Sequence, residues 1–117
     1  MSIYGIGTDI CAIARIEEAV ARFGDGFYER ILTEKERSRE WTVPKLARRW
    51  AIKESVSKAL GCGIGAKVGF QDIDVYHDEN GKPHCVVRGF EHLIIHVSAS
   101  DDTAYASAFA VAETRDA

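Results

Sequence analysis

The chain has 117 residues, a formal charge of −3, and 46% hydrophobic and 28% charged side chains. These values are typical of one folded domain, and they exclude a disordered, collagen-like or fibrous protein. No apolar run approaches the roughly 20 residues of a transmembrane helix, and the N-terminus lacks the features of a secretory signal peptide. We therefore expect a single domain over residues 1–117 that does not contact a membrane.

Hydrophobic periodicity predicts a strand and then short helices at the start of the chain. Residues 2–10 interleave isoleucines with Gly5 and Gly7, which predicts a short buried strand whose glycines allow close backbone approach. Helical spacing over residues 12–23 predicts a helix. A shorter helical segment is expected near residues 27–32.

The middle of the chain is expected to contain the longest helix. Thr33 followed by Glu36 forms a capping box, which predicts a short helix to about Trp41. Pro44 suits the first position of a longer helix, and we expect that helix to end at Leu60, because a glycine follows it.

The second half of the chain changes to the period of two that is typical of strands. Turns are expected at residues 79–82 and 101–102. The fold class is therefore predicted to be α+β, with an N-terminal strand, helices and an antiparallel β meander. The predicted later strands cover residues 70–76, 84–88, 93–98 and 105–111.

Charge is distributed unevenly along the chain. Residues 1–60 carry 11 basic and 9 acidic side chains, a net of +2, whereas residues 61–117 carry 4 and 9, a net of −5. The densest basic stretch, residues 30–58, has nine basic and four acidic side chains. Such a stretch suits an acidic protein or a phosphate-rich ligand.

The cysteines and histidines argue against a structural metal or disulfide framework. Three widely spaced cysteines without a CxxC pair predict reduced thiols in a cytoplasmic protein. His92 and His96 fall in a predicted strand, where residues four apart are separated by roughly 13 Å, so a zinc pair is rejected. His96 is interpreted as a core histidine satisfied by a hydrogen bond. The cysteines are Cys11, Cys62 and Cys85.

Two charged residues of the long predicted helix have two interpretations. Glu54 and Lys58 lie one turn apart, on a face shared with Ala47 and Ala51. They form either an exposed ion pair worth roughly 0.2–0.5 kcal/mol, or a carboxylate for a cation and an amine for a phosphate. A glycine-rich loop at residues 61–65 follows Lys58, and such loops let backbone N–H groups approach phosphate oxygens.

Asp9 also has two interpretations. It ends the first predicted strand and precedes a helix, so it is either the helix N-cap or a carboxylate for a divalent ion. Mg²⁺ typically takes one or two protein carboxylates and completes its shell with water and substrate phosphates. Asp9 and Glu54 together suit that ion.

Several motifs stand in order from Ile3 to about Glu113. Gly-Ile-Gly-Thr-Asp-Ile at 5–10, Trp-Ala-Ile-Lys-Glu-Ser-Val-Ser-Lys-Ala at 50–59 and Gly-Cys-Gly-Ile-Gly at 61–65 resemble the signature of the holo-[acyl-carrier-protein] synthases. These are the small AcpS-type 4′-phosphopantetheinyl transferases. Residues 70–73, 80–83 and 96–98 match later blocks of that family.

The resemblance implies an activity and an assembly. Family members transfer the 4′-phosphopantetheine group of coenzyme A to a serine of apo-acyl carrier protein, which leaves adenosine 3′,5′-bisphosphate and serves fatty acid biosynthesis. They require Mg²⁺ and form homotrimers with active sites at the subunit clefts. The partners implied are therefore apo-acyl carrier protein, coenzyme A and further copies of the chain, without nucleic acid.

The resemblance also implies residue roles. The metal ligands are Asp9 and Glu54, which together with Lys58 form the catalytic set. The coenzyme A contacts are Arg49, Lys58, Gly61, Gly63, Ile64, Gly65 and His96. The carrier-protein contacts are Arg15, Arg22, Lys45 and Arg48. The segment 34–46 is shorter than in some members, which affects the basic contacts made there.

The chemistry leaves some alternatives open. Attack of a serine hydroxyl on the β-phosphate needs charge neutralisation, which Mg²⁺ and Lys58 supply, and the base is either Glu54 or a metal-bound water. One alternative function is a small non-enzymatic domain that binds acidic proteins or nucleic acid through residues 30–58. Another is a hydrolase acting on a different pyrophosphate.

Overall fold

The computed structural model describes residues 1–115, and its architecture is α+β, as predicted. Three strands form one antiparallel sheet in the order β1-β5-β4, so the N-terminal strand pairs with the last one. The other two strands form a separate hairpin, so the expected meander is divided between two sheets. The strands are β1 (Ile3–Ala12), β2 (Ile73–His77), β3 (Pro83–Val87), β4 (Leu93–Asp101) and β5 (Tyr105–Thr114).

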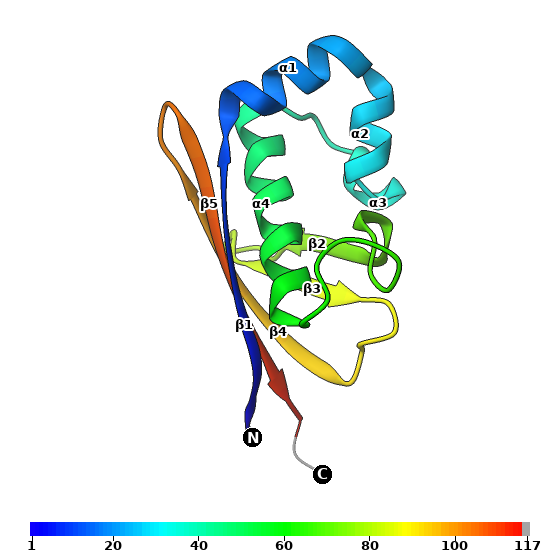
Figure 1. Cartoon of the computed structure of the whole chain (residues 1–117), viewed down its shortest axis with the longest axis vertical. Helices are drawn as coiled ribbons and strands as arrows, with labels where there is room; N and C mark the ends of the chain where they lie inside the picture. Colours follow the sequence, from blue (N-terminus) through cyan, green and yellow to red (C-terminus); the bar gives the residue numbers. More distant parts are fainter. Residues whose placement is uncertain (116–117) are drawn as a thin grey trace.

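All of the helices lie on one side of the three-stranded sheet (Figure 1). Helix α4 (Val43–Ala59) packs along that face and contacts β1, β5 and β4. The helices α1 (Ile13–Phe23) and α2 (Asp25–Ile31) lie at the end of β1 away from the chain termini (Figure 1). Helix α3 (Glu34–Arg37) leads toward α4.

Two local predictions differ from the structure in their bounds. The capping box of Thr33 and Glu36 is confirmed, but α3 ends at Arg37, because the carbonyl of Glu36 accepts a hydrogen bond from Trp41 Nε1 at 2.8 Å. Phe70 belongs to a 3₁₀ turn, Phe70–Asp72, and not to a strand. The Asp72 carboxylate closes that turn by accepting from the N–H of Gly69 at 2.8 Å.

Two glycines allow β1 to lie directly against α4. A Cβ on Gly5 would overlap the carbonyl oxygen of Ala59, and a Cβ on Gly7 would overlap that of Ser55. Both glycines face the helix, and so does Asp9 two positions later, because side chains alternate along a strand. The close approach predicted from the glycines is confirmed, and it brings Asp9 to the helix surface.

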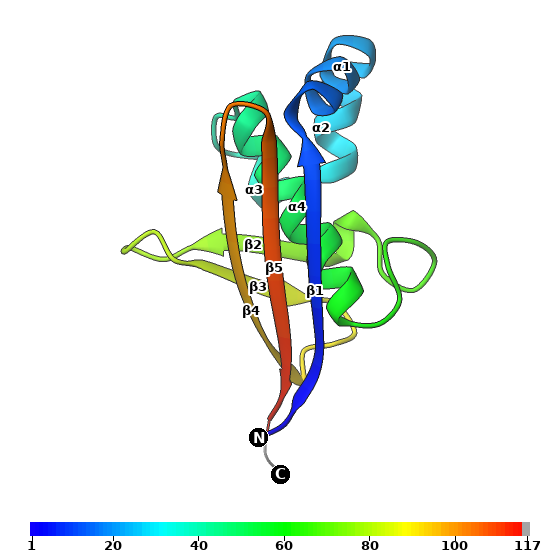
Figure 2. The same cartoon turned by 60° about the vertical axis from the view of Figure 1, so that its left-hand side comes forward.

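The face of the sheet that points away from α4 carries exposed apolar side chains and is uncovered within residues 1–115. Figure 2 shows β1, β5 and β4 in front, with no element over them. Ile6 and Ile10 are 62% and 68% exposed, so the prediction that their strand is buried is wrong for this chain by itself. The reason is that the glycines and small residues occupy the inward positions. Tyr105 and Phe109 of β5 are also exposed, whereas alanines alternate with them on the inner side.

The core lies on both sides of α4. One cluster includes Val56, Val87 and Ala110, between the helix, the sheet and the hairpin. The other includes Ile31 and Leu46, between the helix and the α1–α2 segment. Over residues 1–115, no helix is long and apolar enough to cross a membrane.

Candidate active site

Asp9, Glu54 and Lys58 meet where β1 crosses α4. Lys58 Nζ lies 3.2 Å from Asp9 Oδ1 and also donates to the carbonyl of Thr8 at 3.0 Å. Asp9 is not an N-cap, because the cap position of α1 is Ala12. The ammonium group of Lys58 therefore bridges strand and helix, and the expectation of a simple exposed pair with Glu54 is not met.

The two carboxylates of this cluster suit a hard divalent cation. Asp9 Oδ2 is buried and has no hydrogen-bond partner in the described chain, which is costly unless a ligand uses it. Burial, and then the negative charge of Asp9, raise the pKa of the Glu54 carboxyl. Oxygen ligands of this kind are those that Mg²⁺ prefers. No group of three or more His, Cys, Asp or Glu that could hold a metal occurs among residues 1–115, so water and substrate would complete the shell.

The glycine-rich loop differs from the expectation in its hydrogen bonding. Cys62 and Gly63 both donate their N–H groups to the carbonyl of Ser57, at 3.2 and 3.1 Å. Gly61 donates to Lys58 O and Gly65 to Val68 O. The prediction that the loop offers backbone N–H groups to phosphate is therefore wrong for these four groups. Ile64 is half-buried and packs against both core clusters.

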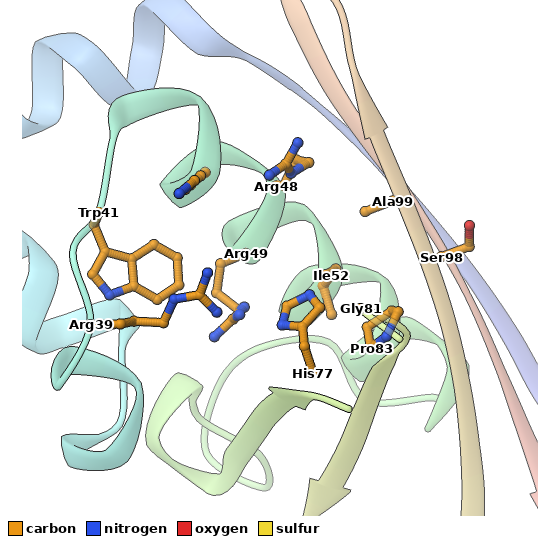
Figure 3. Close-up of a pocket in the computed structure, with 11 residues that line it drawn as sticks. Arg39, Trp41, Arg48, Arg49, Ile52, His77, Gly81, Pro83, Ser98 and Ala99 are labelled. Atoms are coloured by element: carbon orange, nitrogen blue, oxygen red, sulfur yellow. The ribbon is translucent and has the colours of Figure 1, made fainter. Parts of the chain in front are cut away.

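A second site, here called the basic pocket, lies between α4, the β2–β3 hairpin and β4. It is a cavity of about 490 Å³, and the described residues that line it include no Asp or Glu (Figure 3). The basic pocket is thus suited to a polyanion. Its cationic and ring-bearing lining residues are Arg39, Trp41, Lys45, Arg48, Arg49 and His77.

Arg49 reaches the pocket from a buried ion network that the sequence did not predict. Its Nη1 donates to Glu36 Oε2 at 2.8 Å, and Lys53 Nζ donates to Glu36 Oε1 at 2.6 Å. All three side chains are almost fully buried. Burial lowers the pKa of both cations, while Glu36 partly restores it. The burial of Lys53 could have been inferred from its position in the helix. It follows the core residue Leu46 by seven positions and so lies on the same face of α4.

The other predicted site residues are divided, because three lie outside both sites and two line the basic pocket. His96 is exposed on the outer face of the sheet and bonds Glu113 at 3.1 Å, so its interpretation as a core histidine is wrong. Arg15 and Arg22 are exposed on α1, which directly follows β1, and the guanidinium of Arg22 lies over the ring of Phe23. Lys45 and Arg48, expected at the carrier protein, line the basic pocket, and Arg48 also pairs with Asp101 at 2.6 Å.

The sequence and the fold agree with one known family. The sequence profile of the 4′-phosphopantetheinyl transferase superfamily matches residues 5–112. The chain therefore belongs to that superfamily.

Individual relatives define the branch within it. The holo-[acyl-carrier-protein] synthase of Dinoroseobacter shibae is 40% identical over 93% of this chain and 90% of its own, and that of Aliivibrio salmonicida is 40% identical over 97% and 100%. The enzyme from Bacillus anthracis, solved in complex with CoA (3′,5′-ADP), superposes with a TM-score of 0.86 at 40% identity, covering 98% of this chain and 100% of that one. The Helicobacter pylori enzyme, solved with coenzyme A, gives a TM-score of 0.86 at 33% identity, covering 92% and 99%. This chain is an enzyme of the holo-[acyl-carrier-protein] synthase type.

Proposed function

We propose that the chain transfers the 4′-phosphopantetheine group of coenzyme A to a serine of apo-acyl carrier protein, in a Mg²⁺-dependent reaction that serves fatty acid biosynthesis in the cytoplasm. The observation that carries the proposal is the cluster of Asp9, Glu54 and Lys58, in which one buried carboxylate oxygen lacks a partner. The products are holo-acyl carrier protein and adenosine 3′,5′-bisphosphate. Residues 1–117 act as one domain in this proposal.

The cluster supplies charge neutralisation at the pyrophosphate. Asp9 and Glu54 are the residues that would hold Mg²⁺, which when bound stabilises negative charge on phosphate oxygens. Lys58 adds a positive charge at the same place, held in position by its bonds to Thr8 and Asp9. Glu54, whose carboxyl has a raised pKa, is a suitable acceptor for the serine proton.

The basic pocket is the proposed site of the nucleotide end of coenzyme A. No Asp or Glu lines it, although Asp101 pairs with Arg48 and Glu36 pairs with Arg49. The B. anthracis relative was solved with CoA (3′,5′-ADP). Arg39, Arg48 and Arg49 are suited to phosphate because guanidinium groups bind such oxygens in pairs. Two further coenzyme contacts are proposed. One is the loop at 61–65, through atoms other than its four engaged N–H groups, and the other is His96, on the sheet face that a neighbouring copy would cover.

The two sites lie on opposite sides of α4, which supports an active site shared between chains. Lys58 follows Arg49 by nine residues, which turns it by roughly 180° and moves it about 13 Å along the helix. Lys58 contacts the edge strand β1, whereas the pocket includes Ser98 and Ala99 of the other edge strand, β4. A neighbouring copy would thus bring its pocket to this chain's cluster, and the uncovered sheet face would be buried in a homotrimer.

Carrier protein is proposed to dock beside the cluster on α1. Arg15 and Arg22 are exposed there, and they suit an acidic partner through electrostatic steering. The competing proposal of a non-enzymatic binder loses support, because Arg49 and Lys53, two of the nine basic residues in 30–58, are buried.

The direct test is the mass of apo-acyl carrier protein after incubation with the enzyme. A gain of one phosphopantetheine group should require coenzyme A and Mg²⁺ together. Asp9→Asn should abolish the gain while the circular dichroism spectrum stays unchanged. Transfer that persists in the presence of a chelator, or in the Asp9 variant, would contradict the metal assignment. Hydrolysis of coenzyme A without any gain in mass would favour a hydrolase.

A further inference from the structure

The imidazole of His77 points into the basic pocket from the last position of β2. Figure 3 shows it between Arg49 of α4 and Pro83 of β3, with Arg39 and Trp41 farther along the same cavity. Within residues 1–115, no hydrogen bond or ion pair engages this ring. His77 is therefore available to a ligand in the pocket, and it lies outside every block of the family resemblance.

The charges that face His77 are mainly positive. Arg48 and Arg49 approach from α4 and Arg39 from the segment before it, and Lys45 lines the same cavity. Pro83 on β3 and Ser98 on β4 bring no charge. The groups of opposite sign all have other partners. Asp101 pairs with Arg48, and Glu36 pairs with Arg49 and Lys53. The carboxylate of Asp78 accepts from His84 and from the N–H groups of Asn80 and Lys82.

This environment disfavours the protonated form of the His77 imidazole. Burial and then the three arginines lower the pKa of His77, and the neighbouring Asp78 opposes them only weakly. A phosphate group inside the pocket would reverse the balance, since an anion within hydrogen-bond reach favours the charged form of histidine.

We propose that His77 is an anion-binding residue of the basic pocket, which becomes protonated as a phosphate group of coenzyme A binds. The inference rests on the proposed function, because that proposal places the nucleotide end of coenzyme A in this pocket. It adds a proton to the binding reaction: the complex holds one more proton on His77 than the free enzyme does. Coenzyme A affinity should therefore rise as the pH falls, by up to about tenfold per pH unit for one proton.

The test is isothermal titration of the full-length enzyme with coenzyme A and with dephospho-coenzyme A, between about pH 6.5 and pH 8. This range stays above the second pKa of a phosphate monoester, about 6, so that protonation of the ligand interferes little. Buffers with different ionisation heats give the number of protons taken up. The two ligands differ only in the 3′-phosphate, so they show which phosphate His77 contacts.

Three variants separate His77 from a general effect of mutation. His77→Asn should bind coenzyme A with a flatter pH dependence and weaker affinity at low pH, but with nearly wild-type affinity at pH near 8. His77→Lys should bind tightly without the pH dependence. His92→Asn, the same change at an exposed histidine outside the pocket, should match the wild type.

Three outcomes would overturn one or both of these claims. If His77→Asn keeps the wild-type pH dependence and proton uptake, the inference is wrong and the proposed function stands. If the wild type does not bind coenzyme A at any pH, the proposed function fails and the inference fails with it. Loss of affinity by the same factor at every pH in His77→Asn would also contradict the inference, because a neutral contact or a structural defect would explain it.

Discussion

Gly7 determines how near Asp9 comes to the helix. Gly7→Ala would place a methyl group on the carbonyl oxygen of Ser55, so β1 must move away from α4. Overpacking of this kind typically costs about 1–3 kcal/mol. We expect a lower urea midpoint, together with a larger loss of transfer activity than the stability change explains, because Asp9 moves with its strand.

The matched control for Gly7→Ala is Gly26→Ala. Gly26 lies in α2, has open space around it and does not have a positive φ. Alanine should stabilise that helix, by up to about 1 kcal/mol. Equal effects of the two substitutions on urea unfolding would contradict the packing argument.

Glu54 is a residue where function and stability oppose each other. Its raised pKa means that the native state binds a proton more tightly than the unfolded chain does. This contribution favours folding at low pH and is lost as the pH rises through the native pKa of Glu54. Glu54→Gln should therefore raise the melting temperature near neutral pH in the absence of metal, with a smaller difference near pH 4, while transfer activity is lost.

A comparison isolates the cluster from a general charge effect. Glu17→Gln makes the same change at an exposed position of α1. It should leave the melting temperature almost unchanged at both pH values. Destabilisation of Glu54→Gln at neutral pH would show that the Glu54 carboxylate is stabilised in the native state.

At the scale of elements, the Glu36 network joins five segments of the chain. Glu36 accepts from Arg49 and Lys53 on α4 and from the N–H of Val75 on β2. Lys53 also donates to the carbonyls of Ile31 on α2 and Phe70 in the 3₁₀ turn. The network thus holds Arg49, which lines the basic pocket, in a fixed position relative to the helices and β2.

Removal of the single anion from this network should be severe. Glu36→Gln leaves two buried cations without a counter-charge, and the expected cost is about 3–5 kcal/mol in the free energy of unfolding. Lys53→Met should cost less, because it leaves the pair of Glu36 and Arg49 balanced. Urea unfolding measures both. Glu40→Gln, an exposed control on the same segment, should be neutral, and a Glu36 variant as stable as that control would contradict the network's role.

The sequence predicted the elements better than it predicted their faces. The capping box at Thr33 indicated local geometry correctly, because its effect depends on neighbours in sequence. The glycines of β1 indicated a close backbone approach, but not that the partner would be α4. The burial of Lys53 was not predicted and the exposure of Ile10 was predicted wrongly, because both depend on segments that are distant in sequence. A buried lysine needs a partner 17 residues away, and an exposed isoleucine depends on which side of the strand α4 covers.

The candidate site was predictable only in part. The motif at 50–59 and Asp9 indicated the cluster, and the structure brings Asp9 to Lys58 as expected. The basic pocket was not predicted as a cavity, because it needs three segments that are distant in sequence. His77 in particular belongs to no motif, and only its position beside the arginines suggests a role.

At the scale of the whole molecule, the uncovered sheet face should be buried by assembly. Phe109 is 48% exposed at the centre of that face, next to Thr8 of β1. Phe109→Glu would place a charge in the proposed interface, so sedimentation should change from about three chains to one. Val86→Glu, at a similarly exposed apolar residue of the β2–β3 hairpin, should leave the assembly intact. A wild type that sediments as a monomer would contradict the proposal.

Sharing of the active site between chains can be tested by complementation. Asp9→Asn disables the cluster, and the double change of Arg39→Ala and Lys45→Ala weakens the pocket, so each variant alone should have little activity. Chains mixed during refolding should regain up to roughly one quarter of the wild-type activity, since a random cyclic assembly pairs an intact cluster with an intact pocket at one interface in four. Mixing the folded variants without exchange of chains is the control. If the refolded mixture assembles but gains no activity, each cluster uses the pocket of its own chain. That result would contradict the shared active site that we infer from the positions of Arg49 and Lys58 on opposite sides of α4.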